Sequence, residues 1–323
     1  MIRRSFLGLA SAAAAVSMIA VAPVAAAPDI PCGTAKLIVP WGAGGGTDVI
    51  FRIIVEAANK HGADPQIQVV NIGGQGGNKG AKEAVKAKPD GCTLFAIHQS
   101  ALSSYLTGRV DFTWDAFTPV ALMTRTPTIY GANAKVPYSN LKELQAYAKA
   151  HPNEVLAGGT LGSTSHFAML ELQDAAGVEF KHISYDGTRE RMTALLANTI
   201  HIGEINLAAA KKYIQSGELK ALAITTEERN PEIPDVPTAK EQGFDLVIGV
   251  DRGIVLPKGA SKEVVDHYIA ILREVANDPN IQKQMTAKGS SMPFTAGDDY
   301  RDYFEKTFAK WKQIAINVGM YKG

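Results

Sequence analysis

The sequence is poor in several features that mark common classes of protein. It has only two cysteines in 323 residues, too few for a disulfide-rich scaffold or a four-thiolate metal site but enough for one bridge. Basic and acidic residues balance, at 33 and 32, which excludes the strongly basic character of nucleic-acid-binding proteins. The seven histidines are scattered, without the paired spacing of metal ligands. These scarcities predict no metal, no cofactor and no nucleic-acid partner.

Signatures of nucleotide-binding and hydrolytic enzymes are also missing. The glycine loop at residues 42–47 has Thr47 where the third glycine of a dinucleotide-binding fingerprint would stand. Neither a Gly-Lys-Ser/Thr phosphate loop nor a Gly-x-Ser-x-Gly nucleophile elbow occurs. His98, Ser100 and His166 are candidates for a hydrolase site, but none lies in an activating motif. The sequence therefore favours a binding protein, with a periplasmic hydrolase as the less favoured alternative.

Residues 1–27 have the composition of an export signal. Arg3 and Arg4 precede an alanine-rich, uncharged stretch that ends in three alanines at residues 25–27. The paired arginines before Phe6 resemble a twin-arginine signal, and a Sec signal is the alternative. We expect this segment to be removed and the mature protein to reside in the periplasm.

Strand-like and helix-like segments alternate along the rest of the chain. Short apolar runs, such as residues 36–39 and 93–97, are each followed by a turn and a segment with helical spacing. Such alternation is typical of a mostly parallel sheet flanked by helices. Because single domains are commonly no longer than about 150 residues, we expect the chain to form two α/β lobes. We predict that lobe 1 comprises residues 28–132 and 254–323, and lobe 2 residues 133–253.

Three glycine-rich segments follow predicted strands, at residues 41–48, 71–77 and 158–165. In open α/β sheets, ligands bind at the carboxyl ends of the strands, where glycine lets backbone N–H groups approach an anion at a helix N-terminus. Glycine can also serve only to form tight turns. Three such loops at equivalent positions favour a binding site for a small anion such as a carboxylate.

Seven segments, in order along the chain, carry a family pattern. They are VPWGAGGGTD at 39–48 with Arg52, VNIGGQGGNKG at 70–80, KPDGCTL at 88–94, GSTSH at 162–166, HISYDG at 182–187, SGELKALA at 216–223 and IPDVPT at 233–238. Together they resemble the substrate-binding receptors of tripartite tricarboxylate transporters, also called Bug receptors. The resemblance implies a two-lobed periplasmic-binding-protein, or clamshell, fold.

The function implied by this resemblance is capture of a small organic acid between the two lobes. The acid would be a dicarboxylate, a tricarboxylate or an aromatic acid, delivered to the membrane permease subunits of the transporter. We expect a monomer without catalytic activity. A periplasmic sensor that feeds a two-component system is an alternative that the sequence does not separate from transport.

The resemblance also implies which residues hold the ligand. They are Trp41, Gly44, Gly45, Thr47 and Asp48 on one lobe, and Ser163, Tyr185, Asp186, Gly187 and Thr188 on the other. Trp41 would lie against the carbon body of the ligand; alternatively, it wedges the glycine loop against the core. Asp48 opens a helix, so it could simply be the N-cap.

Several positions depart from the family pattern: Trp41 stands where Phe is more usual, Ser184 replaces Pro, and a third departure lies at residues 249–253. Arg252, within residues 249–253, stands where many members have a Trp-x-Gly segment. Its guanidinium could bind a second carboxylate of the ligand, or it could pair with the neighbouring Asp251. Three other arginines are weaker candidates for the second carboxylate: Arg125, Arg189 and Arg191.

The two cysteines, Cys32 and Cys92, precede the predicted first and third strands. These strands would be neighbours in a flavodoxin-like order, which would bring the cysteines close enough to bridge. Export to an oxidising compartment favours a disulfide. Two buried free thiols are the alternative.

Overall fold

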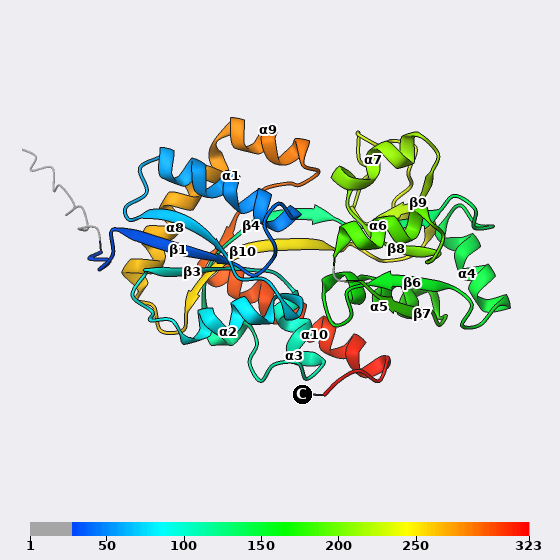
Figure 1. Cartoon of the computed structure of the whole chain (residues 1–323), viewed down its shortest axis with the longest axis horizontal. Coiled ribbons are helices and arrows are strands. Elements are labelled where there is room, and N and C mark those ends of the chain that lie inside the picture. Colours follow the sequence, from blue (N-terminus) through cyan, green and yellow to red (C-terminus); the bar gives the residue numbers. More distant parts are fainter. Residues whose placement is uncertain (1–27, 186, 323) are drawn as a thin grey trace, which may run out of the picture.

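The structure, a computed structural model, describes residues 28–185 and 187–322 (Figure 1). The predicted export signal, at residues 1–27, and one predicted ligand residue, Asp186, lie outside the described residues. Within the described part of the chain, no helix has the length and apolar character needed to cross a bilayer.

The first lobe is built on a six-stranded sheet with the order β11-β4-β10-β3-β1-β2. Its strands are β1 (Thr34–Val39), β2 (Gln66–Asn71), β3 (Thr93–Ile97), β4 (Phe117–Pro127), β10 (Gly249–Pro257) and β11 (Thr295–Ala296). β1 is parallel to β2 and β3, whereas β10 is antiparallel to β3 and β4. The carboxyl ends of β1, β2 and β3 therefore meet at one edge of the sheet.

Helices cover both faces of this sheet. They are α1 (Gly46–Lys60), α2 (Asn78–Lys86), α3 (Ser100–Leu106), α8 (Lys262–Asn277), α9 (Pro279–Ala287) and α10 (Gly297–Asn317). Side chains alternate across a strand, so Leu37 packs under α1, α8 and α9, while its neighbour Ile38 packs under α2, α3 and α10. Burial of both faces explains why β3 and the second half of β1 are almost continuously apolar, whereas the edge strand β2 alternates polar and apolar residues.

The second lobe has a five-stranded sheet with the order β7-β6-β8-β5-β9. Its strands are β5 (Ile129–Asn133), β6 (Leu156–Gly159), β7 (Lys181–Ser184), β8 (Ile202–Ile205) and β9 (Leu219–Ile224), and its helices are α4 (Leu141–Ala150), α5 (Thr164–Ala176), α6 (Thr188–Leu196) and α7 (Leu207–Gln215). Along the whole described chain there are also single 3₁₀ turns: η1 (Gln75–Gly77) and η2 (Trp114–Ala116) lie between elements of the first lobe, and η3 (Lys240–Gln242) precedes β10. β6 is parallel to β7 and β8, and β5 is antiparallel to β8 and β9.

The two-lobed α/β fold was predicted correctly, but the prediction of mostly parallel sheets is wrong, because both sheets are mixed. β4 carries the chain toward the second lobe and β10 brings it back, so these two long strands lie antiparallel along their length (Figure 1). The helix–strand alternation in the sequence predicts parallel pairs only where a crossover helix intervenes. Between β4 and β10 the chain builds the whole second lobe, with helices α4 to α7, rather than a single crossover helix packed on the first sheet.

Sheet membership shows where the chain changes lobes. β4 of the first sheet ends at Pro127 and β5 of the second sheet begins at Ile129, while the return strand β10 begins at Gly249. Residues 129–133 thus belong to the second sheet and residues 249–253 to the first. The lobe bounds given above, 132/133 and 253/254, stay a prediction.

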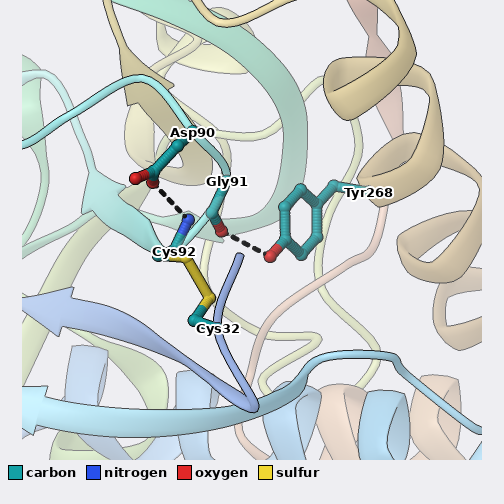
Figure 2. Close-up of a disulfide and its surroundings, with 5 residues drawn as sticks. All are labelled: Cys32, Asp90, Gly91, Cys92 and Tyr268. Atoms are coloured by element: carbon teal, nitrogen blue, oxygen red, sulfur yellow. Dashed lines mark hydrogen bonds between the residues drawn. A yellow bond between two sulfur atoms is a disulfide. The ribbon is translucent and has the colours of Figure 1, made fainter. Parts of the chain in front are cut away.

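Cys32 and Cys92 are joined by a disulfide, with their Cα atoms 5.9 Å apart (Figure 2). The backbone N–H of Cys92 donates to Asp90 Oδ1 at 3.0 Å, and the Tyr268 hydroxyl donates to the carbonyl of Gly91 at 2.6 Å. The bridge therefore fastens the segment before β1 to a turn that α8 also holds, at the end of the first lobe remote from the second.

Candidate ligand-binding site

The loop after β1 presents the N-terminus of α1. Its glycines are exposed, and the N-cap, Gly45, provides no side-chain cap. The first N–H groups of a helix have no partner within that helix, and they carry the positive end of its dipole. Figure 1 shows this end of α1 turned toward the second lobe. The local structure therefore offers donors for an anion between the lobes.

Asp48 shapes this loop from within. The prediction that it is the N-cap is wrong, since Gly45 holds that position. The Asp48 carboxylate, 1% exposed, accepts from the Gly44 N–H at 2.8 Å, from Asn71 Nδ2 at 2.8 Å and from Arg52 Nε at 3.0 Å. Burial alone would raise the pKa of Asp48, but these hydrogen bonds outweigh it and hold the pKa below its ordinary value. Asp48 therefore braces the glycine loop as an anion; a contact with ligand stays a prediction.

Trp41 packs back onto the first lobe. Its indole stacks on the imidazole of His98, with 5.0 Å between ring centroids, and lies so close to Gly77 that a Cβ atom there would be 3.3 Å away. The indole Nε1 is buried without a hydrogen-bond partner among the described residues. This packing corresponds to the wedge role, and contact with a ligand stays a prediction.

His98 contacts the second lobe. It follows β3, and its Nδ1 accepts from the Ser100 N–H at 3.2 Å and lies 3.1 Å from the Thr164 hydroxyl. Burial, assisted by the nearby Arg252 cation, lowers the pKa of His98 to about 3. The imidazole is therefore neutral at physiological pH.

The second lobe brings two helix N-termini to the same junction. Ser163 is the N-cap of α5 and Gly187 the N-cap of α6. Ser163 is buried, with its hydroxyl 3.2 Å from that of Ser165, and Thr188 begins α6. The loops before the two helices are tied together, since Thr160 Oγ1 donates to the carbonyl of Tyr185 at 2.6 Å.

Two of the weaker arginine candidates are already paired. Arg191 is buried beneath these loops, where its Nη2 bonds Glu204 at 2.5 Å and its Nη1 reaches the Ser165 hydroxyl at 3.3 Å. Arg125 holds both oxygens of Asp251 at 2.6 Å. These two guanidinium groups are therefore occupied within the protein. The third, Arg189, is exposed on α6.

Arg252 is different. Asp251 and Arg252 are consecutive residues of β10, so their side chains leave opposite faces of the sheet, and the predicted alternative in which they pair is wrong. Arg252 Nε donates to Thr47 Oγ1 at 3.0 Å, and its Nη1 donates to Thr126 Oγ1 at 2.7 Å. The side chain, 7% exposed, has no carboxylate within ion-pair distance among the described residues.

The charge of Arg252 persists despite this burial. Desolvation lowers its pKa to about 10, against the opposing effect of Glu204 and Asp251, so the guanidinium remains a cation at neutral pH. Burying an ion without a counter-charge costs several kcal/mol. A site that holds such a cation beside the N-terminus of α1 is suited to an anionic ligand.

Some residues at this junction were not predicted to bind ligand, although His98 was named above as a candidate for a hydrolase site. His98 follows β3 as Trp41 follows β1, and the rule that ligands bind at the carboxyl ends of neighbouring parallel strands could have identified it. Thr164, which faces His98, directly follows the predicted Ser163. Thr126, which holds Arg252, lies within β4 and gives no signal in the sequence. No group of His, Cys, Asp or Glu side chains in the described ranges is placed to hold a metal ion.

Two α/β lobes joined by long strands, with helix N-termini meeting at their junction, define a solute-binding protein of the periplasmic-binding-protein class. The chain belongs to the tripartite tricarboxylate transporter receptor family (TctC), whose model matches residues 50–320. The predicted family is thereby confirmed. Because this is a family of receptors, the non-catalytic interpretation is confirmed and the hydrolase alternative falls.

Relatives and solved structures agree with this assignment. The chain is 31% identical to the UPF0065 protein in the gbd 5' region of Cupriavidus necator, over 99% of each chain. The structure of the periplasmic binding protein BugD is 28% identical, with a TM-score of 0.78 over 90% of this chain and 99% of that one. MatC from Rhodopseudomonas palustris, described with bound malate, is 27% identical, with a TM-score of 0.76 over 87% and 98%.

Proposed function

We propose that this chain is an exported receptor, acting in the periplasm as a monomer, that captures a small dicarboxylate between its lobes for the permease subunits of a tripartite tricarboxylate transporter. The observation that carries the proposal is the buried Arg252 cation, which bonds Thr47 at the start of α1 and has no carboxylate partner among the described residues. A ligand carboxylate would supply the missing counter-charge.

The first carboxylate of the ligand would bind at the glycine loop. The exposed backbone at Gly44 and Gly45 would lie against the carboxylate, and the backbone N–H of Thr47, together with the Arg252 guanidinium, would replace the water that the carboxylate loses on binding. The N–H groups of Gly44 and Gly45 already donate to Asp48 and to the carbonyl of Gly42, so they hold the loop in shape for the ligand. Charge-assisted hydrogen bonds of this kind are about twice as strong as neutral ones.

The second carboxylate would bind at the N-termini of α5 and α6. The residues proposed there are Ser163, Tyr185, Asp186, Gly187 and Thr188. A molecule with carboxylates at both ends can engage both lobes at once, which explains how binding would favour closure. Malate, bound by a relative of similar fold, is such a molecule.

Isothermal titration calorimetry with a panel of acids tests this function. We expect dicarboxylates of four to six carbons to bind, and the monoamide of the best ligand to bind at least about tenfold more weakly, because one end loses its charge. Arg252→Ala should weaken the best diacid by about 100-fold, and Arg252→Lys by less, since a lysine keeps the charge but not the fork of donors. Arg273→Ala, which removes an arginine from α8, is the matched control.

Two results would contradict the proposal. If no member of the panel binds, the chain is not a carboxylate receptor. If Arg252→Ala binds the diacid as tightly as the unchanged protein does, the buried cation is not the counter-charge for the ligand. Delivery to the permease is tested separately, by uptake of the labelled ligand into cells of the source organism with the gene deleted and then restored.

A further inference from the structure

Arg109 bonds both lobes at once. It follows α3 in the first lobe, and its Nη2 donates to the carbonyl of Gln75 at 2.8 Å within that lobe. Its Nη1 donates to the carbonyls of Leu161 at 3.0 Å and Gly162 at 3.2 Å in the second lobe. All three acceptors belong to two of the glycine-rich loops that the sequence analysis identified, at residues 71–77 and 158–165. One guanidinium thus connects a loop of each lobe.

Glycine on both sides makes room for this side chain. A Cβ atom on Gly76 would lie 2.9 Å from Arg109 Nη2, and one on Gly162 would lie 2.8 Å from Nη1. Both glycines have positive φ, at 66° and 70°, where a side chain is strained in any case. The two backbones can therefore approach the guanidinium from opposite lobes only because neither position carries a side chain.

The bonds of Arg109 lie at the outer end of a row of contacts between the lobes. At the inner end, His98 Nδ1 of the first lobe lies 3.1 Å from the Thr164 hydroxyl of the second. Next along α3, Ser103 Oγ donates to the carbonyl of Gly162 at 2.9 Å. These inner groups are buried, whereas Arg109 is only half-buried. Contacts that are open to water at the outer end are the ones that can break first when the lobes separate.

A second junction between the lobes is of another kind. Trp311 of α10 stacks on Phe167 of α5 at 4.7 Å between centroids and donates its Nε1 to Glu171 at 2.9 Å. These side chains are buried in an apolar cluster that α3, α5 and α10 share. Figure 1 shows α10 running beneath the first sheet toward the second lobe. This apolar junction is suited to a lasting pivot, whereas the polar bonds of Arg109 are suited to a reversible fastening.

We propose that Arg109 is a positioning residue for ligand capture, which fastens the loop at residues 158–165 to the loop at residues 71–77 when the lobes are closed. The same loops lead into α5 and α2, so the fastening holds the second-lobe donors in place over the ligand. Its effect is on release, because these bonds must break before the lobes can separate. This inference rests on the proposed function for its effect on ligand, but its effect on lobe closure can be measured without one.

The test combines lobe distances with ligand kinetics. Glu56→Cys on α1 and Lys142→Cys on α4 introduce exposed labelling sites in the two lobes, and the native cysteines are held in their disulfide. In this doubly labelled protein without ligand, we expect Arg109→Ala to shift the spin-label distance distribution toward longer distances. With malate as the probe ligand, stopped-flow measurements should show dissociation about tenfold faster and association unchanged.

Two further variants separate the fastening from loss of charge or of folding. Lys82→Ala removes an exposed cation that lines one surface hollow together with Arg109, and it should leave both measurements unchanged. Gly76→Ala keeps the charge but crowds the guanidinium, so it should reproduce the effect of Arg109→Ala. Circular dichroism melting establishes that each variant is folded.

Each outcome decides the proposal. If Arg109→Ala leaves both the distances and the dissociation rate as in the unchanged protein, or if Lys82→Ala shifts them equally, the fastening role is refuted. If Arg109→Ala shifts the spin-label distances but neither malate nor any other acid of the panel binds, the role of Arg109 in lobe closure is supported and the proposed ligand class is refuted.

Discussion

Replacing Glu171 by glutamine tests how the C-terminal helix is joined to the second lobe. The Glu171 carboxylate, 2% exposed, accepts from Trp311 Nε1 at 2.9 Å and lies 2.6 Å from Lys310 Nζ. Burial raises the pKa of Glu171 more than Lys310 and Trp311 lower it, so the pKa lies above its ordinary value. Lys310 is half exposed, so water screens its attraction.

The sign of the effect follows from this raised pKa. A carboxyl group whose pKa is higher in the folded protein than in the unfolded chain stabilises the fold at low pH. This stabilisation is complete below the pKa of the unfolded chain, about 4.3, and it is lost as pH rises through the pKa of the folded protein. Each unit of raised pKa corresponds to about 1.4 kcal/mol once the group is ionised. Glutamine has no charge to bury, and its carbonyl can still accept from Trp311. We expect Glu171→Gln to raise the free energy of unfolding at pH 8 by on the order of 1 kcal/mol, and to have little effect at pH 4.

Urea unfolding at pH 4, 6 and 8, followed by tryptophan fluorescence, measures this difference. Glu154→Gln, which changes an exposed glutamate of the same lobe, is the control and should be neutral at each pH. The reasoning is refuted if Glu171→Gln destabilises the protein at pH 8 more than at pH 4, because the ion pair with Lys310 would then outweigh desolvation.

Two further substitutions test other parts of the fold. The double variant Cys32→Ser, Cys92→Ser should lose roughly 4 kcal/mol of unfolding free energy, because the bridge restricts a loop of 60 residues in the unfolded chain. Urea unfolding of the oxidised protein and of the variant, side by side, measures this loss. An equal unfolding midpoint for both would contradict the estimate. Gly253→Ala should lower the free energy of unfolding by roughly 3 kcal/mol or more, the cost of overpacking a core. The reason is that a Cβ atom at this position would lie 2.1 Å from the Tyr300 hydroxyl and 2.6 Å from the carbonyl of Ala121. A melting temperature like that of the unchanged protein would show that Tyr300 can move aside.

Local patterns predicted much of the fold. The run of apolar residues at 36–39 followed by glycines and helical spacing became β1, its loop and α1, because a buried strand and a helix have different periods that the sequence shows directly. The direction of β10 was not predictable in this way. Its antiparallel pairing with β4 joins residues more than 120 positions apart, and no local pattern records which strand returns from the second lobe.

The candidate site was predictable in its loops but not in its electrostatics. The glycine segments stand out in the sequence, and the structure places a helix N-terminus at the end of each of the three, with the N-caps at Gly45, Gly77 and Ser163. The partners of Asp48 were not foreseen, since Asn71 comes from the end of β2, which only the sheet order brings beside the first loop.

The arginines show why a side chain's role depends on the fold rather than on its type. Arg125 and Arg252 lie on neighbouring antiparallel strands, where register pairs Arg252 with Thr124 and Asp251 with Arg125. Because of that register, the Asp251 carboxylate pairs with the Arg125 guanidinium, and the Tyr303 hydroxyl donates a further hydrogen bond at 2.8 Å to the same carboxylate. Since successive residues of a strand face opposite ways, the acid next to Arg252 in sequence is the one it cannot reach. The two hydroxyl groups that it does reach, those of Thr47 and Thr126, orient the guanidinium but carry no charge to balance it. This is why the function proposed above assigns a ligand anion to Arg252 as its partner.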